Sequence, residues 1–276
     1  MAIRKLSVVV ATLLLSVACS SAAGPAAATA ATQHHVFLIV MENHSAEEAL
    51  GGTFTASLAA KYGVANNYHA VSHPSVPNYL ALTSGNTWGV RDDSYYRLPR
   101  QDLGDQLTKA NVTWRAYMEG LVDGDCLNSP LPYDPGHNPF AYYGGACPPN
   151  VVPLSAQAFD LASATPRFSW ITPDACHDTH NCSVAEGDDW LRQEVGAIMA
   201  SSAWKSNGVL FITWDEDDHS TDNHVLTLVV TPNRGHHVSA QMYTHYSLLA
   251  TVEDLLGVGR LGQAAAAQPM SDLIKP

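Results

Sequence analysis

Basic residues are scarce in this chain of 276 residues, which has 14 Lys and Arg against 26 Asp and Glu and a formal net charge of −12. Because the phosphates of nucleic acids need basic partners, we expect no binding to nucleic-acid polymers. The chain also has no visible internal repeat and no C-x-x-C pair, the usual spacing of a cysteine metal site. An anionic ester still fits such a chain if a metal ion supplies positive charge locally.

The N-terminal residues have the pattern of a secretory signal peptide. Arg4 and Lys5 precede an apolar run over residues 6–18, which is too short to span a membrane, and a tail of small residues follows. Two forms of processing remain open. One is cleavage after the small residues at 30–31, and the other is a lipid on Cys19 in the imperfect lipoprotein box LSVAC.

Either form of processing predicts export from a bacterial cell, as a secreted protein or as one anchored at the cell surface. Residues 1–32 are then the signal peptide and an Ala-rich tail, and residues 33–276 form a single domain. Membrane contact is expected only through a lipid on Cys19.

Four cysteines in loop-like sequence support export, because an oxidising compartment favours disulfides. Sequence order favours the pairs Cys126–Cys147 and Cys176–Cys182, although four cysteines allow three connectivities. A cysteine metal site is the weaker alternative.

Apolar runs alternate with helical patterns along the chain, which predicts an α/β fold with a mostly parallel central sheet and helices on both faces. The predicted strands are residues 35–42, 63–71, 112–119, 167–172, 208–216 and 225–232. The predicted helices are residues 54–61, 77–84, 102–110, 188–203 and 244–257, with Gly85 and Gly257 as stops. Residues 120–152 are dense in Pro, Gly, Asn and Asp and predict a long functional loop.

Polar clusters follow four of the predicted strands. They are residues 42–44, 69–79, 174–180 and 215–219. Because ligands bind at the carboxyl ends of strands in an open α/β sheet, we expect these clusters to converge. Their carboxylates, imidazoles and amide are ligands for Zn, Mn, Ca or Mg.

Ser75 is the predicted nucleophile. It stands at the start of a predicted helix, where free N–H groups favour an anionic ester. A nearby cation would activate its hydroxyl. Taken alone, however, Ser75 is typical of a helix N-cap, Glu42-Asn43 of a turn, and DEDDH of a solvated loop. Asp215 directly follows a buried strand, and a buried carboxylate needs a partner. His69, His73 and His137 have no predicted role beyond structure or exposure.

Five motifs together resemble the bacterial phosphoesterase family of acid phosphatases and phospholipases C, within the alkaline phosphatase superfamily. They are MENHS, HPSVPNYLALTSG, TPDACHD, FITWDEDD and THYSLLATVEDLLG, and they occur in order over nearly all of residues 33–276.

The resemblance implies an alkaline phosphatase-like fold and a metal-dependent phosphoric-ester hydrolase with a phosphoserine intermediate. The implied catalytic residues are Ser75, Asn43, His177 and His180. The implied metal ligands are Glu42, Asn43, Ser75, Asp215 and Glu216. A second metal or phosphate site would draw on Asp174, Asp178, His236, His237 and His245, among which the sequence does not choose.

The chain lacks the C-terminal extensions of many phospholipases C, which favours a phosphatase of small soluble esters. A phospholipase C-type phosphodiesterase is the alternative. A sulfatase is disfavoured because Tyr79 stands where the C/S-x-P-x-R pattern has Arg. A cell-surface binding module without turnover is a further alternative, and the intact nucleophile position and carboxylates argue against it.

Overall fold

The computed structural model describes residues 1–3 and 33–274, and residues 33–274 belong to one compact unit. The predicted signal peptide and Cys19 lie outside the described residues, apart from the first three. No helix in the described part of the chain combines the length and the apolar character that crossing a membrane requires.

An eight-stranded sheet forms the centre of this unit, in the order β4-β3-β5-β1-β6-β7-β2-β8. The strands are β1 (His35–Met41), β2 (Gly63–His69), β3 (Trp114–Met118), β4 (Val151–Pro153), β5 (Phe168–Thr172), β6 (Gly208–Trp214), β7 (Thr227–Val230) and β8 (His237–Thr244). Of these strands only β7 runs antiparallel to its neighbours. The carboxyl ends of the other seven therefore meet at one edge of the sheet.

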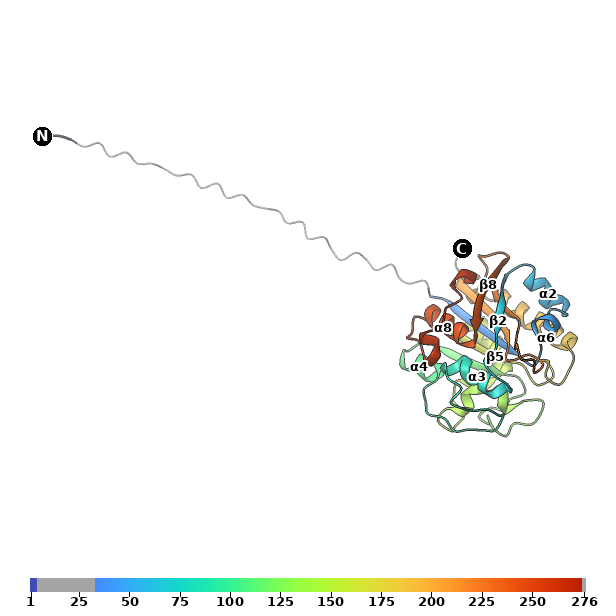
Figure 1. Cartoon of the computed structure of the whole chain (residues 1–276). Coiled ribbons are helices and arrows are strands. Elements are labelled where there is room, and N and C mark those ends of the chain that lie inside the picture. The colour runs from blue at the N-terminus through green and yellow to red at the C-terminus, as the bar shows by residue number, and fades with distance from the viewer. Residues whose placement is uncertain (4–32, 275–276) are drawn as a thin grey trace. The chain divides into compact units, whose positions relative to one another are not determined.

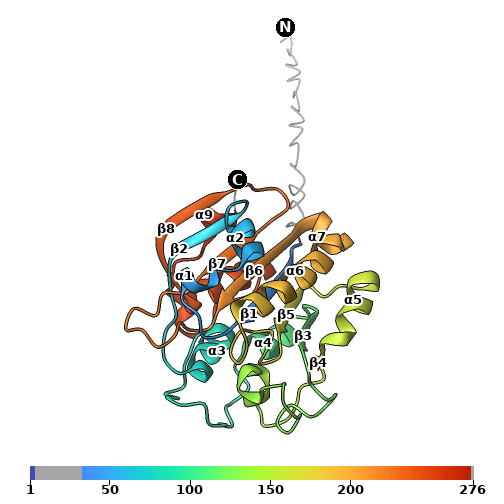
Figure 2. The ribbon, with the colours of Figure 1, turned by 90° about the vertical axis from the view of Figure 1, so that its right-hand side faces the viewer.

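Helices cover both faces of the sheet, as predicted. They are α1 (Ala46–Ala49), α2 (Thr53–Ala59), α3 (Ser75–Ser84), α4 (Leu103–Lys109), α5 (Gln157–Ser163), α6 (Val184–Ala200), α7 (Ser202–Asn207), α8 (His245–Leu256) and α9 (Ser271–Ile274). Short 3-10 turns are η1 (Pro135–His137), η2 (Pro139–Tyr142), η3 (Leu154–Ala156) and η4 (Gly262–Ala265). Helices α3, α4 and α8 pack together on one face, and α2 and α6 lie on the other (Figure 1). Figure 2 looks onto the α6 face.

Apolar burial explains why the central strands were readable from the sequence. Every residue of β6 is buried, and so is every residue of β1 except His35. Strands buried on both faces appear in a sequence as continuous apolar runs. The predicted stops are also present, because Gly85 and Gly257 follow α3 and α8 in the left-handed conformation, with φ of 66° and 74°.

Some elements differ from the prediction for physical reasons. The edge strand β8 is mostly exposed and has no apolar run, so its sequence resembles a loop. Strand β4 and helix α5 were missed because both are short and only partly buried. The predicted helix 188–203 begins earlier, at a capping box of Ser183 and Glu186, and Ser201 then caps a separate helix, α7.

Both predicted disulfides, Cys126–Cys147 and Cys176–Cys182, are present. The first crosses the long loop over residues 120–152, which contains η1 and η2 and contributes buried side chains to the core. The loop is thus a packed excursion and not a tether.

Candidate active site

Neighbouring strands bring the main polar residues together. Met41 of β1 is paired with Trp214 of β6, so the residues that follow, Glu42 and Asp215, emerge side by side at the carboxyl edge. Glu42, Asp215 and Glu216 are fully buried. The sheet topology therefore produces a buried carboxylate cluster from segments more than 170 residues apart.

Ser75 faces this cluster from the start of α3. Its Oγ donates toward Glu42 Oε2 at 3.1 Å and toward Glu216 Oε1 at 3.3 Å. Pro74, not Ser75, is the N-cap, and no side chain caps the first turn. The hydroxyl is thus directed away from the helix backbone, which is the opposite of what an N-cap role requires.

Asn43 connects the two sides of the cluster. Its backbone N–H donates to Asp215 Oδ1 at 3.3 Å, and its Nδ2 donates to Glu216 Oε1 at 3.5 Å. Its φ of 52° lies in the left-handed region, which asparagine adopts more readily than most residues other than glycine.

The donor set fits a divalent cation. Among the described residues, Asn43 Oδ1 and Asp215 Oδ2 are buried oxygens without a hydrogen-bond partner, and Glu42 Oε1 has only a contact of 3.3 Å with His137 Nε2. Buried oxygens that lack partners are costly. Burial, with the charge of Glu216, raises the pKa of Asp215 to about 7, and burial raises that of Glu216 to about 8. Burial, with the charges of Asp215 and Asp178, raises the pKa of Glu42 well above its usual value. A cation among these oxygens would relieve both the repulsion and the missing contacts.

His137 borders the same cluster, although the sequence gave no reason to choose it. Its Nε2 lies 3.3 Å from Glu42 Oε1, and its Nδ1 donates to Asp178 Oδ2 at 2.8 Å. The ring stacks on Tyr79 at 5.6 Å. Burial acts to lower the pKa of His137, but the hydrogen bond and charge of Asp178 outweigh it, so the pKa is raised. Asp178 therefore holds the ring with Nε2 toward the site.

His180 is exposed, and its ring centroid lies 5.5 Å from that of His137. Glu42, His137 and His180 each place one ligand atom within 4.8 Å of the others, which makes them a candidate metal group. The prediction of a role for His180 thus has a geometric basis beside the Ser75 cluster.

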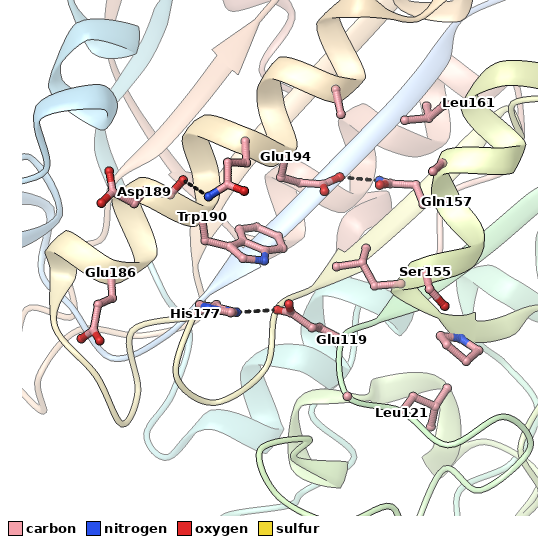
Figure 3. Close-up of a pocket in the computed structure, with 16 residues that line it drawn as sticks. Glu119, Leu121, Ser155, Gln157, Leu161, His177, Glu186, Asp189, Trp190 and Glu194 are labelled. Carbon is pink, nitrogen blue, oxygen red and sulfur yellow. Dashed lines mark hydrogen bonds and ion pairs between the residues drawn. The ribbon is translucent and has the colours of Figure 1, made fainter.

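His177 and Asp174 lie away from Ser75, and together with Glu119 they place ligand atoms within 4.8 Å of one another as a separate candidate metal group. His177 Nδ1 donates to Glu119 Oε2 at 3.0 Å, and its ring stacks on Trp190 (Figure 3). Asp174 Oδ1 accepts from the backbone of Cys176 and His177 and so closes a turn. His177, Glu119 and Trp190 line a separate cleft of about 980 Å³.

The histidines proposed for a second metal also do not join the site as ligands. His237 pairs with Gly63 at the amino end of β2, and His236 bonds to Ala59 on the same side, so both lie at the opposite edge. His245 is buried with both nitrogens occupied: Nε2 donates to the Asp215 carbonyl at 2.6 Å and Nδ1 accepts from Tyr68. Burial lowers its pKa to about 4, so His245 is a neutral support behind Asp215.

Two further residues of the segment around Ser75, residues 72–79 (SHPSVPNY), have defined contacts. His73 Nδ1 contacts Glu216 Oε2, and its Nε2 lies 3.0 Å from the Ser220 carbonyl. Asn78 is buried and accepts from the backbone of Val71 and Ser72 at 3.0 Å each, which fixes the loop before Ser75. A polar residue close to a nucleophile in sequence was the only available signal for His73.

Comparison with known proteins agrees with this geometry. Residues 52–259, three quarters of the chain, match the model of the Phosphoesterase family. The chain belongs to the Phosphoesterase family. Glu42 and Asn43 lie before the matched segment, so their place in the site rests on the structure.

Named relatives include bacterial and fungal phosphatases. The chain is 34% identical over 253 residues to a phosphatidylinositol-3-phosphatase of Mycobacterium tuberculosis, a match that covers 86% of this chain and 82% of that protein. It is 26% identical to a phosphate-repressible acid phosphatase of Penicillium chrysogenum, over 82% of this chain and 59% of that one. This phosphoesterase chain is thus a phosphoric-ester hydrolase of acid-phosphatase type.

Solved structures agree on the fold. A protein of the alkaline phosphatase superfamily from Vibrio parahaemolyticus superimposes with a TM-score of 0.58 at 13% identity, covering 83% of this chain and 68% of that one. A murine ectonucleotide pyrophosphatase/phosphodiesterase gives 0.60 at 9% identity, with 83% and 96% covered. The predicted alkaline phosphatase-like α/β fold is confirmed.

Proposed function

We propose that this phosphoesterase is an exported, metal-dependent phosphomonoesterase that acts through a phosphoserine on Ser75. The observation that carries the proposal is the position of Ser75 Oγ, 3.1 Å from Glu42 Oε2 and 3.3 Å from Glu216 Oε1, at the start of α3. A hydroxyl between two buried carboxylates that also have orphan oxygens nearby is the arrangement expected around a cation.

Glu42, Asn43, Asp215 and Glu216 would hold the cation together with Ser75 Oγ. When bound, the cation would lower the pKa of the serine hydroxyl and neutralise charge on the phosphoryl oxygens. Oxygen donors predominate in the set, which suits Mn, Ca or Mg, while His137 and His180 next to Glu42 would also suit Zn.

The chain's own residues supply the remaining steps. Ser75 Oγ forms the bond to phosphorus as the bond from phosphorus to the alcohol oxygen breaks. The hydroxyl proton leaves toward Glu42 Oε2, and the departing alkoxide takes a proton from solvent water. In the second step a water oxygen bonds to phosphorus as the bond from phosphorus to Ser75 Oγ breaks, and a proton returns to Oγ as phosphate is released. His137, held by Asp178, presents Nε2 to a phosphoryl oxygen.

Export is part of the proposal because two disulfides are expected only in an oxidising compartment. The signal-peptide pattern of the N-terminal residues supports the same location.

The decisive experiment compares Ser75→Ala with Ser72→Ala on p-nitrophenyl phosphate. Ser72 is a matched control because, within residues 33–274, its hydroxyl donates only to the His73 carbonyl, at 3.1 Å. We expect Ser75→Ala to lose at least about a thousandfold in kcat and Ser72→Ala to stay within about threefold. Mass spectrometry of acid-quenched wild type should find the phosphoryl group on the Ser75 peptide. A folded Ser75→Ala variant with wild-type turnover would exclude the serine mechanism.

Chelation tests the metal part separately. We expect a chelator to remove turnover and a divalent cation to restore it, with anomalous scattering locating the ion among Glu42, Asn43, Asp215 and Glu216. Bound metal without hydrolysis of any phosphate ester would instead support a binding module.

A further inference from the structure

A second, smaller hollow lies beside the start of α3. It has a volume of about 350 Å³. It is separate from the larger cleft that Figure 3 shows. The lining residues are Asp93, Tyr95, Leu127, Asp134, Pro135, Gly136 and Tyr142. They come from the loop after α3 and from the 120–152 excursion. In these two segments only His137 has a role in the proposed chemistry.

This hollow borders the first turn of α3, which begins at the proposed nucleophile. Asp93 Oδ1 accepts from the backbone N–H of Val76 at 3.0 Å, and Val76 follows Ser75 directly. Gly136 lies against Val76 from the other side, since a Cβ on Gly136 would be 3.7 Å from Val76 Cγ2. Gly136 also directly precedes His137. The hollow thus begins within one residue of two proposed active-site groups.

The charges in the hollow have one sign. Among the described residues that line it, Asp93 and Asp134 are carboxylates and none is Lys or Arg. An alcohol group bound here would therefore experience a negative potential close to the reacting phosphorus.

The remaining walls are aromatic and apolar. The rings of Tyr95 and Tyr142 lie 5.3 Å apart at 45°, and Leu127 is 39% exposed at the rim. Tyrosine faces bind apolar groups and organic cations, the latter through the ring quadrupole. Neither wall offers a site for a second phosphate or carboxylate.

We propose that this hollow holds the alcohol part of the ester and selects alcohols that are apolar and carry no negative charge, with a cationic group favoured over a neutral one. The inference rests on the proposed function, because it needs the ester phosphorus at Ser75. It separates this chain from enzymes whose substrate carries a second anionic group beside the ester.

The experiment uses three aryl phosphates that carry one meta substituent of different charge, trimethylammonio, methyl or carboxylate, and each rate is compared with that expected from the pKa of the phenol released. We expect kcat/KM to fall in that order, with about tenfold between the methyl and carboxylate esters at low salt. The spread should narrow as salt is raised, because the hollow opens to solvent and its charges are screened.

Asp134→Asn tests the source of the selectivity. Asn keeps an oxygen to accept from the Gly136 N–H, which Asp134 Oδ1 does at 2.7 Å, and removes only the charge. We expect the variant to reduce the methyl-to-carboxylate ratio about threefold or more while leaving the neutral ester within about twofold. Asp123→Asn is the matched control, an exposed residue of the same excursion outside the hollow.

Equal kcat/KM for all three esters, or an unchanged ratio in Asp134→Asn, would overturn the inference while Ser75-dependent turnover still stood. Loss of the Ser75 requirement would overturn the proposed function instead. The two failures are therefore distinguishable within one set of assays.

Discussion

Two histidine–carboxylate pairs meet at the same turn of the chain, but they differ in burial and in the groups that surround them. The His137–Asp178 pair is buried, and its Nε2 lies 3.3 Å from Glu42 Oε1. The His177–Glu119 pair is partly exposed, with 38% of the His177 side chain accessible, and lines the cleft next to Trp190. Residues 177 and 178 are consecutive in sequence, but each belongs to a different pair. Neighbours in sequence therefore lie in different environments.

The proposed reacting centre therefore does not lie in the larger cleft. The cleft of about 980 Å³ contains the His177–Glu119 pair, whereas the carboxylates around Ser75 are fully buried. A phosphoryl group is small, so the reacting centre needs charge and positioning more than volume. A choice by cleft size alone would select the His177–Glu119 pair instead.

Replacing the histidine of each pair should give the largest difference in kcat/KM between the two pairs. We expect His137→Asn to lower kcat/KM for p-nitrophenyl phosphate about a hundredfold, because Nε2 faces the reacting centre. The matched His177→Asn should stay within about threefold. Thermal unfolding of both variants checks that each is folded. Equal losses would show that the cleft takes part in the reaction.

Replacing the carboxylate partner of each histidine should give a smaller difference in activity between the two pairs, in the same direction. Asp178→Asn replaces the acceptor of His137 Nδ1 and frees the ring to turn, for which we expect a loss of about ten- to thirtyfold. Glu119→Gln makes the corresponding change at His177 and should alter activity less than about twofold. A pH–rate profile displaced only in Asp178→Asn would show that it acts through His137.

The carboxylate cluster should also make stability depend on pH in the metal-free protein. The folded pKa values of Asp215 and Glu216, about 7 and about 8, lie above the usual values of about 4. Between these limits the unfolded chain has lost protons that the folded chain keeps, so the free energy of unfolding falls as pH rises.

We therefore expect the chelated protein to have a lower Tm at pH 8 than at pH 5.5, and a divalent cation to raise Tm most at pH 8. Asp215→Asn should flatten the dependence in chelator, whereas Glu119→Gln should not. A Tm that rises with pH in the chelated protein would contradict this.

The sequence predicted which side chains of the candidate site converge wherever a buried strand carries them to the sheet edge. Glu42 and Asp215 each follow a continuous apolar run, and the parallel order of β1 and β6 then brings them together. Ser75 was readable from its place before a helix. The central strands and the two disulfides followed from the same kind of local signal.

The sequence failed where placement depended on tertiary packing. His137 lies in a long excursion without periodicity, and only the packed η1 turn carries it to Glu42. His236 and His237 follow β7, the antiparallel strand, so the chain is already back at the opposite edge. That reversal has no sequence signature, because parallel and antiparallel buried strands have the same apolar pattern.

The smallest expected effect lies in the cleft of the His177–Glu119 pair. Glu194 accepts from Gln157 Nε2 there, and burial raises its pKa to about 7. The unfolded chain loses this proton near pH 4.5, so the contribution of Glu194 to stability falls as pH rises from there to about 7. Glu194→Gln removes the titration and should raise Tm by about 1–3 °C at pH 8 with no gain at pH 5. Activity should be unchanged at both pH values, since the cleft is separate from Ser75. A pH-dependent change in kcat in this variant would instead couple the two regions and end the distinction between the two pairs.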